Sequence, residues 1–261
     1  MTPGPFIREA GTGPGVVCLH ANLSSSSQWR MLMEQLAPRC RVVAPDSYGA
    51  GQSPAPPQGQ RLSLRDEVAF LEPAFARAGE SFTLVGHSYG AAVALIMALE
   101  QPHRVRGLAL YEPTLFGLVD AESAPPNDAD GIRHAVDAAV AALENHDPNR
   151  AAEIFTDYWT GEGAWSRMSE ARRGPIAAAS VQICGWAHAL FDEPTPLAAF
   201  SQIRIPVLYM MGANSPASAR AVGRLLTDVL PQVHVVTFDG LGHMGPISHP
   251  AMINAAIASA L

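Results

Sequence analysis

The pentapeptide GHSYG at residues 86–90 places a serine between two glycines, after an apolar run and before a helical pattern. A strand-to-helix turn of this G-x-S-x-G type holds its serine in a strained backbone conformation and projects the hydroxyl above the sheet. The glycines let strand and helix approach without a Cβ clash. The N–H of Tyr89 then lies at a helix N-terminus, where it can stabilise an oxyanion. The pattern predicts Ser88 as a nucleophile, and an ordinary glycine-flanked turn is the alternative.

A serine hydroxyl is a weak nucleophile until a base removes its proton. The chain has nine histidines, so residue type alone selects none of them. His243 lies in a Gly-His pair after the last apolar run, which places it in a loop at the same sheet edge as Ser88. We therefore predict His243 as the general base. His87 is expected to point away into packing, and His20 is expected to be structural.

These side chains require elements that bring distant segments together, and short apolar runs do alternate with helical patterns. Strands are predicted at 16–19, 41–44, 82–85, 107–111, 206–211 and 234–238. Helices are predicted at 28–36, 64–78, 91–100, 217–229 and 251–261. Pro73 should kink or split the second helix. The alternation predicts an α/β fold, a mostly parallel sheet with helices on both faces.

The alternation breaks between residues 113 and 195, where Ala-rich helical segments carry the aromatic residues Phe155, Tyr158, Trp159, Trp165, Trp186 and Phe191. We interpret residues 113–195 as an inserted helical cap. Residues 1–112 and 196–261 form the core in this interpretation. Some cap aromatics are expected to face the cleft, which would favour an apolar acyl or aromatic substrate.

The composition of the chain argues against several kinds of binding partner. Hydrophobic residues make up 48% of the chain and charged residues 16%, with a net charge of −7 and no basic block. Phosphate-backbone binding needs clustered Lys and Arg, so we expect no nucleic-acid partner. Three cysteines without a CxxC pair support neither a disulfide framework nor a zinc site. With no signal peptide or membrane-spanning run apparent, a cytoplasmic protein without metal or cofactor is expected. The oligomeric state stays open.

The chain resembles the α/β-hydrolase superfamily along most of its length. Besides the serine pentapeptide and the late Gly-His pair, residues 20–22 (HAN) resemble the family's His-Gly oxyanion turn. Residues 46–53 (DSYGAGQS) fit its D-x-x-G-x-G-x-S loop. The resemblance implies that the backbone N–H groups of Asn22 and Tyr89 form an oxyanion hole. The alternative for Asn22 is a turn residue that caps the serine-rich loop.

The sequence departs from this family at the acid that orients the base. The family usually supplies an aspartate after the strand matching 206–211, whereas residues 212–216 (GANSP) contain no carboxylate. A haloalkane dehalogenase-like branch places its acid after the strand matching 107–111, where Glu112 stands here. We therefore predict Glu112 as the acid. Glu112 could instead cap a turn or pair with Arg106, and Asp239 is a rival that would need to fold back.

Together these residues predict a cofactor-free serine hydrolase. It would cleave an ester-like bond of a small apolar substrate through an acyl-enzyme, with Ser88, His243 and Glu112 as the triad. Lactonase, perhydrolase and carbon–carbon bond hydrolase activities fit the same machinery. A ligand-binding or receptor-like homologue with little turnover is the alternative from another class, supported by the missing aspartate.

Overall fold

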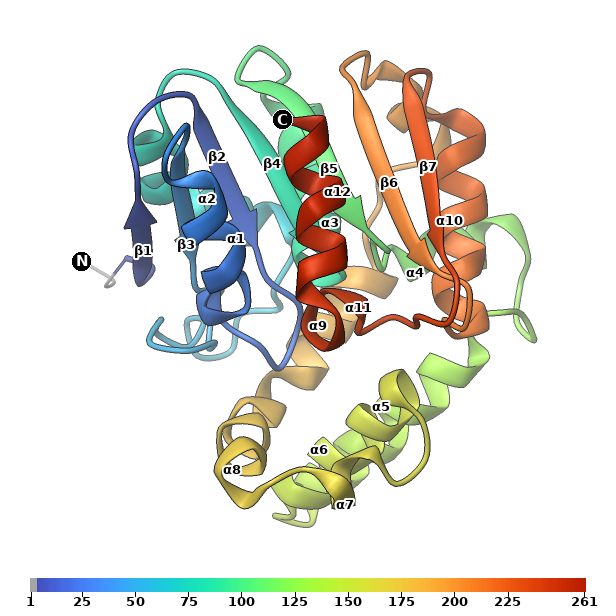
Figure 1. The fold of residues 1–261 in the computed structure, drawn as a ribbon. Coiled ribbons are helices and arrows are strands. Elements are labelled where there is room, and N and C mark those ends of the chain that lie inside the picture. The colour runs from blue at the N-terminus through green and yellow to red at the C-terminus, as the bar shows by residue number, and fades with distance from the viewer. Residues whose placement is uncertain (1–3) are drawn as a thin grey trace.

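The computed structural model describes residues 4–261, and over that range its centre is a seven-stranded sheet. The strand order is β1-β3-β2-β4-β5-β6-β7 (Figure 1). The strands are β1 (Ile7–Ala10), β2 (Gly15–Leu19), β3 (Arg41–Pro45), β4 (Phe82–His87), β5 (Val105–Tyr111), β6 (Val207–Gly212) and β7 (Val233–Phe238). Only β1 runs antiparallel to its neighbour in the described sheet, so the carboxyl ends of the other strands meet at one edge. The predicted parallel α/β class is confirmed. The sequence pattern does not predict β1, a four-residue strand with none of its residues fully buried.

Alternating side chains divide the apolar interior into one core on each face of the sheet. In β2, Val17 and Leu19 belong to one core, whereas Val16 and Cys18 belong to the other. The first face is covered by α2 (Leu64–Ala78), α3 (Tyr89–Glu100) and α10 (Ala217–Val229), and the second by α1 (Arg30–Leu36) and α12 (Pro250–Ala260). Figure 1 shows α1 and α12 in front of the sheet. Because both faces are covered, the central strand β2 is buried along its whole length, whereas β7 at the edge is largely exposed.

Helix α2 is not split, contrary to one of the two outcomes expected at Pro73. It runs unbroken over Leu64–Ala78 and begins with a capping box between Ser63 and Asp66. Proline removes the hydrogen bond to the carbonyl four residues earlier. Here that carbonyl belongs to Ala69, and both Ala69 and Pro73 are exposed. The freed group therefore lies on the side of the helix that faces water, while the buried side keeps its packing.

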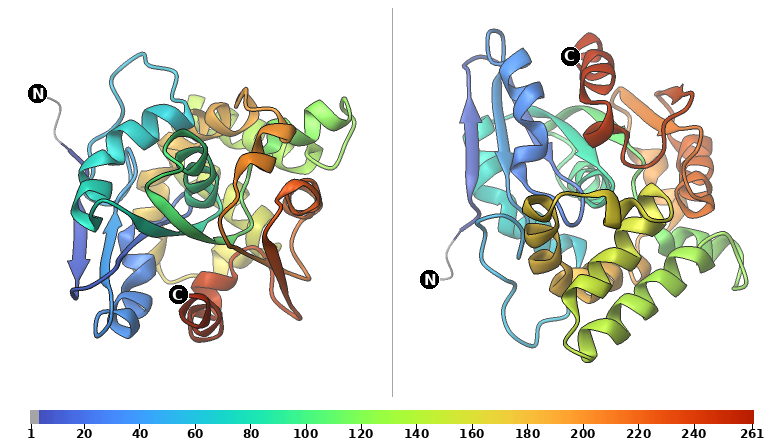
Figure 2. Two further views of the ribbon diagram at one scale, coloured as in Figure 1. Left: turned by 90° about the horizontal axis from the view of Figure 1, so that it is seen from above. Right: turned by 60° about the horizontal axis from the view of Figure 1, so that its bottom comes forward.

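Between β5 and β6 the chain forms helices instead of strands. They are α4 (Phe116–Glu122), α5 (Asp130–Glu144), α6 (Pro148–Thr160), α7 (Ala164–Arg167), α8 (Glu170–Ala179) and α9 (Ile183–Phe191). Figure 1 shows α5 to α8 below the sheet, at the end toward which the parallel strands point, and the right view of Figure 2 brings them forward. Phe116 and Trp186 join the apolar core that also contains α3. The helices therefore lie over the edge where the strands end.

Three kinds of feature are absent from residues 4–261. None of the helices there is long and apolar enough to cross a bilayer. No three His, Cys, Asp or Glu side chains in this range gather as metal ligands. Its three cysteines are unpaired.

Candidate active site

Ser88 occupies the strained turn that the sequence predicts. It lies between β4 and α3 with φ 55° and ψ −116°, a conformation that L-residues rarely adopt. A Cβ on Gly86 would lie 2.5 Å from the Cα of Ala91, and one on Gly90 would lie 2.4 Å from the carbonyl oxygen of Leu19. Both positions therefore require glycine. The turn holds the Ser88 hydroxyl at the carboxyl edge of the sheet.

His243 hydrogen-bonds to two side chains, one through each ring nitrogen. Its Nε2 lies 2.9 Å from the hydroxyl oxygen of Ser88, and its Nδ1 lies 2.6 Å from Oε2 of Glu112. The ring sits in the loop between β7 and α11 (Gly245–Ser248), and the Tyr111 hydroxyl donates to the carbonyl of Gly242 there at 2.8 Å. The three residues come together in the order hydroxyl, imidazole and carboxylate. Such an order allows the ring to take a proton from the serine while the carboxylate orients it.

Glu112 receives its support from the loop in which the family usually places an aspartate. Its Oε1 accepts hydrogen bonds from the backbone N–H of Gly212 at 2.7 Å and from the hydroxyl of Ser215 at 2.5 Å. Its backbone has φ 44°, at the end of β5, and the residue is 1% exposed. A buried carboxylate needs partners for both oxygens. The donors from 212–216 and His243 supply them.

The alternatives considered for the acid beside His243 do not fit the structure. Within residues 4–261, Glu112 forms no ion pair with Arg106, and the basic side chain that it contacts is the imidazole of His243. Asp239 is exposed and makes no hydrogen bond to His243 among the described residues. Glu112 is therefore the carboxylate at the ring.

His87 does more than pack, which corrects the sequence expectation. Its Nε2 donates to the backbone carbonyl of His243 at 2.9 Å, and its Nδ1 accepts from the amide of Gln28 at 3.1 Å. The other end of that amide accepts from the N–H of Ala21 at 3.2 Å. Burial holds the pKa of His87 well below its ordinary value, so the ring is neutral and can accept at one nitrogen. The chain of bonds ties the loop of His243 to the turn that carries Asn22.

The two predicted oxyanion donors come from separate segments, the turn after β2 and the start of α3. Tyr89 is the first residue of α3, so its N–H has no partner within the helix. The N–H of Asn22 has no acceptor among residues 4–261, and Asn22 lines the small pocket at Ser88. His20 is structural as predicted, because its Nδ1 donates to the carbonyl of Ala21 and its Nε2 accepts from the N–H of Ser47.

A second buried carboxylate, Glu67, lies behind the nucleophile turn and was not singled out by the sequence. It accepts hydrogen bonds from the Tyr89 hydroxyl and from the N–H of Tyr48, each at 3.0 Å. Burial raises its pKa to about 7, although both hydrogen bonds act in the opposite direction. Glu67 therefore changes charge near neutral pH without touching Ser88 or His243.

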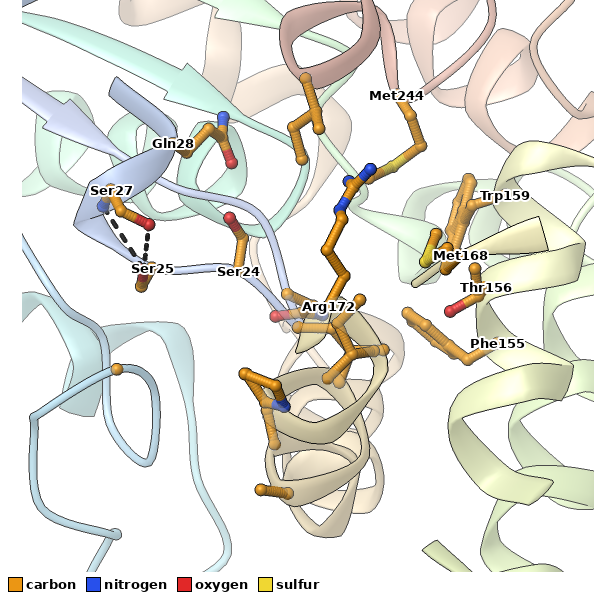
Figure 3. A pocket seen from close by; sticks show the side chains of 18 of the residues that line it. Ser24, Ser25, Ser27, Gln28, Phe155, Thr156, Trp159, Met168, Arg172 and Met244 are labelled. Carbon is orange, nitrogen blue, oxygen red and sulfur yellow. Dashed lines mark hydrogen bonds between the residues drawn. The ribbon is translucent and has the colours of Figure 1, made fainter. Parts of the chain in front are cut away.

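Two spaces adjoin the site. The inner pocket, of about 10 Å³, is lined by Ser88 and mostly apolar side chains of α4, α5, α6 and α9. The outer cavity, of about 580 Å³, lies between the Asn22–Gln28 segment, α6, α8 and Met244 (Figure 3). Asn22, Phe155 and Trp159 line both spaces. A volume near 600 Å³ is typical of ligand pockets, whereas 10 Å³ holds about one water.

Trp159 closes the site from the cap side. Its indole stacks on the imidazole of His243, with ring centroids 3.9 Å apart and an angle of 28° between the planes. The exposed fractions of Ser88 and His243 are 5% and 1%. The expectation that some cap aromatics face the site is met by Phe155, Trp159 and Phe191, which line the inner pocket.

Comparisons with known proteins agree with the fold described above. Residues 14–250 match the family model described as alpha/beta hydrolase fold. The chain is 28% identical to a 2-(acetamidomethylene)succinate hydrolase of Mesorhizobium japonicum over 91% of this chain and 84% of that protein. It is 38% identical to a haloalkane dehalogenase of the same organism, but only over 41% of this chain and 34% of the dehalogenase. The crystal structure of an alpha/beta hydrolase from Sphaerobacter thermophilus superposes with a TM-score of 0.72 at 25% identity, covering 97% and 98% of the two chains.

Proposed function

The chain belongs to the α/β-hydrolase fold family, and on that premise we propose that it is a serine hydrolase of small ester-like substrates. One observation carries the proposal: Ser88, His243 and Glu112 form a continuous chain of hydrogen bonds. The similarity to named hydrolases supports the general class, the hydrogen-bond geometry supports a serine nucleophile, and the ester-like bond is our choice among the bonds that this machinery can cleave.

In the proposed reaction, the Ser88 hydroxyl oxygen attacks the substrate carbonyl carbon while its proton passes to Nε2 of His243. The N–H groups of Asn22 and Tyr89 stabilise the oxyanion that forms, and each such donor is worth roughly 3–4 kcal/mol. The tetrahedral intermediate expels the leaving alcohol, which takes the proton from His243. An acyl-enzyme remains on Ser88.

Deacylation repeats these steps with water as the nucleophile. His243 removes a proton from the water, whose oxygen attacks the acyl carbon, and Ser88 leaves with the proton returned by the ring. In both halves Glu112 accepts the Nδ1–H of His243 and stabilises the imidazolium. The carboxylic acid product departs, and no cofactor takes part in the proposed cycle.

We assign substrate selection to the helices of residues 113–195. The inner pocket at Ser88 is almost filled, so in this proposal side chains that line it move when the substrate carbonyl reaches the hydroxyl. Phe155 and Trp159 stand on that helix between the two spaces. Their rotation or a shift of α6 would open the path, as lid movements do in other enzymes. The apolar lining favours an apolar group next to the scissile bond.

The alternative of a binding protein without turnover loses its main support. That support was the lack of a carboxylate in residues 212–216, and Glu112 now occupies the required position beside Nδ1 of His243.

A fluorophosphonate probe tests the proposal because it reacts with serines activated by a base. We expect rapid labelling of the wild-type chain, loss of labelling in Ser88→Ala, and unchanged labelling in the exposed-site control Ser166→Ala. Hydrolysis of 4-nitrophenyl butyrate should likewise be lost in Ser88→Ala and unchanged in Ser166→Ala. Labelling of Ser88→Ala at the wild-type rate would rule out Ser88 as the nucleophile.

A further inference from the structure

Arg172 is the one charged side chain among the described residues that line the outer cavity. It extends from α8, and Figure 3 shows it crossing the middle of the cavity toward Met244, between Ser24 and Trp159. No aspartate or glutamate lines this space within residues 4–261. A guanidinium is always charged in proteins and presents several N–H donors in one plane. The cavity therefore offers a positive site without a matching negative group.

The guanidinium of Arg172 is also unpaired. None of the ion pairs formed within residues 4–261 includes it, and neither does any side-chain hydrogen bond of that range. Of two other arginines in the helices between β5 and β6, Arg133 pairs with Asp120, whereas Arg173 forms no ion pair among the described residues and its guanidinium lies 5.9 Å from the ring centre of Trp165. Of these three arginines, Arg172 alone lines the outer cavity, where it is exposed to solvent at the cavity's open side.

Other lining groups are suited to the same kind of ligand. Ser24, Ser25 and Ser27 bring hydroxyls to the wall opposite α6, and Thr156 brings one from α6 itself. The remainder of the wall is mainly apolar, with Phe155, Met168 and Ile176 among its residues. A ligand with an apolar body and a single anionic group matches this combination, because carboxylates form bidentate, charge-assisted hydrogen bonds with arginine.

We propose that the outer cavity binds the carboxylate of an anionic acyl substrate through Arg172, an inference that rests on the hydrolase function proposed above. The outer cavity and the inner pocket share Asn22, Phe155 and Trp159. A substrate held by Arg172 therefore has its carbonyl directed past Trp159 toward Ser88. The substrate class is an ester-like compound with an apolar spacer between the scissile carbonyl and a distal carboxylate.

Matched esters test this assignment. Mono-4-nitrophenyl esters of succinate, glutarate and adipate carry a distal carboxylate, and 4-nitrophenyl butyrate, valerate and hexanoate are their neutral counterparts. We expect the ratio of kcat/KM, anionic over neutral at equal chain length, to fall about tenfold in Arg172→Gln, equivalent to about 1.4 kcal/mol. Arg172→Lys should recover part of the ratio, because lysine keeps the positive charge but lacks the paired N–H donors that bind a carboxylate through two hydrogen bonds.

Arg167→Gln is the matched control, because it removes the same charge from α7 at a residue that does not line the cavity. Its ratio should stay within twofold of wild type. Raising the salt concentration should lower the ratio of the wild-type chain and leave that of Arg172→Gln unchanged, since ions screen the guanidinium. An unchanged ratio in Arg172→Gln would overturn the assignment.

A binding measurement separates this inference from the hydrolase proposal. Glutarate is not an ester, so calorimetric titration of the wild-type chain reports the site without turnover. We expect glutarate to bind wild type and Arg167→Gln alike and to bind Arg172→Gln at least tenfold more weakly. If no ester is cleaved but this difference is found, the anion site stands and the hydrolase function fails. If esters are cleaved but glutarate does not bind, the proposed carboxylate site is contradicted. The same holds if inorganic phosphate binds to the wild-type chain and glutarate does not.

Discussion

The indole of Trp159 lies on the imidazole of His243, with ring centroids 3.9 Å apart. The two residues come from α6 and from the loop after β7, so a side chain from the helices between β5 and β6 covers a ring carried by a loop of the sheet. In the proposed mechanism this ring becomes positively charged in each half-reaction. A cation over the face of a tryptophan is stabilised by about 0.5–2 kcal/mol. Trp159 is therefore a positioning residue for His243 as well as part of the wall between the two spaces.

Removal of this indole should slow turnover. We expect Trp159→Leu to lower kcat for 4-nitrophenyl acetate by about threefold to thirtyfold, from the lost cation–π contact. Trp159→Phe should recover much of the loss, because it keeps an aromatic face. Trp165→Leu is the control, since Trp165 packs within the cap away from the inner pocket. Equal losses of kcat in Trp159→Leu and Trp165→Leu would show that only cap packing matters.

Glu112 should be required for fast hydrolysis despite its unusual place after β5. Glu112→Gln keeps the shape but removes the negative charge beside Nδ1 of His243, and we expect kcat to fall about 10⁴-fold, as for triad acids in known enzymes. Thermal melting of the variant checks that it is folded. Glu122→Gln changes an exposed glutamate of α4 and should stay within twofold of wild type. A loss of only a few-fold in Glu112→Gln would reject the triad role.

The hydrogen bonds that connect Gln28 through His87 to the backbone of His243 should be needed for the full kcat. Gln28→Met keeps the length of the side chain and removes both hydrogen bonds, to the N–H of Ala21 and to the ring of His87. Each such bond contributes about 1 kcal/mol, so we expect kcat to fall about tenfold. Steady-state kinetics of Gln35→Met, at an exposed position of α1, gives the control. A lower melting temperature with unchanged kcat would assign the link to stability alone.

Stability should depend on pH through Glu67. Burial raises the pKa of this carboxyl from 4.5 to about 7, so the folded chain holds the proton more tightly than the unfolded chain does. The stabilisation is fully present below pH 4.5 and is lost as pH rises through about 7. A difference of this size corresponds to about 3 kcal/mol of unfolding free energy.

Glu67→Gln should remove this dependence, because an amide does not titrate there. Urea unfolding between pH 4 and pH 8 should show wild type losing up to about 3 kcal/mol relative to Glu67→Gln. Glu80→Gln, at an exposed position, should follow the wild-type curve. Parallel curves for wild type and Glu67→Gln would show that Glu67 does not titrate in this range.

The local sequence was enough to predict the order of strands and helices and the places of Ser88 and His243. The glycines around Ser88 are needed within the turn itself, and His243 follows a strand directly enough for its loop to be assigned to the sheet edge. Patterns of this kind encode conformation over a few residues, where period and turn chemistry are visible.

Only the tertiary structure decided which distant side chains meet. Adjacency to a strand made Glu112 a candidate, but its preference over Asp239 depends on loop paths and on the donors from Gly212 and Ser215. The stacking of Trp159 on His243 and the position of Arg172 at the outer cavity likewise depend on how α6 and α8 lie relative to the sheet. Such placements are set by packing between segments far apart in the chain, and no local period in the sequence records them.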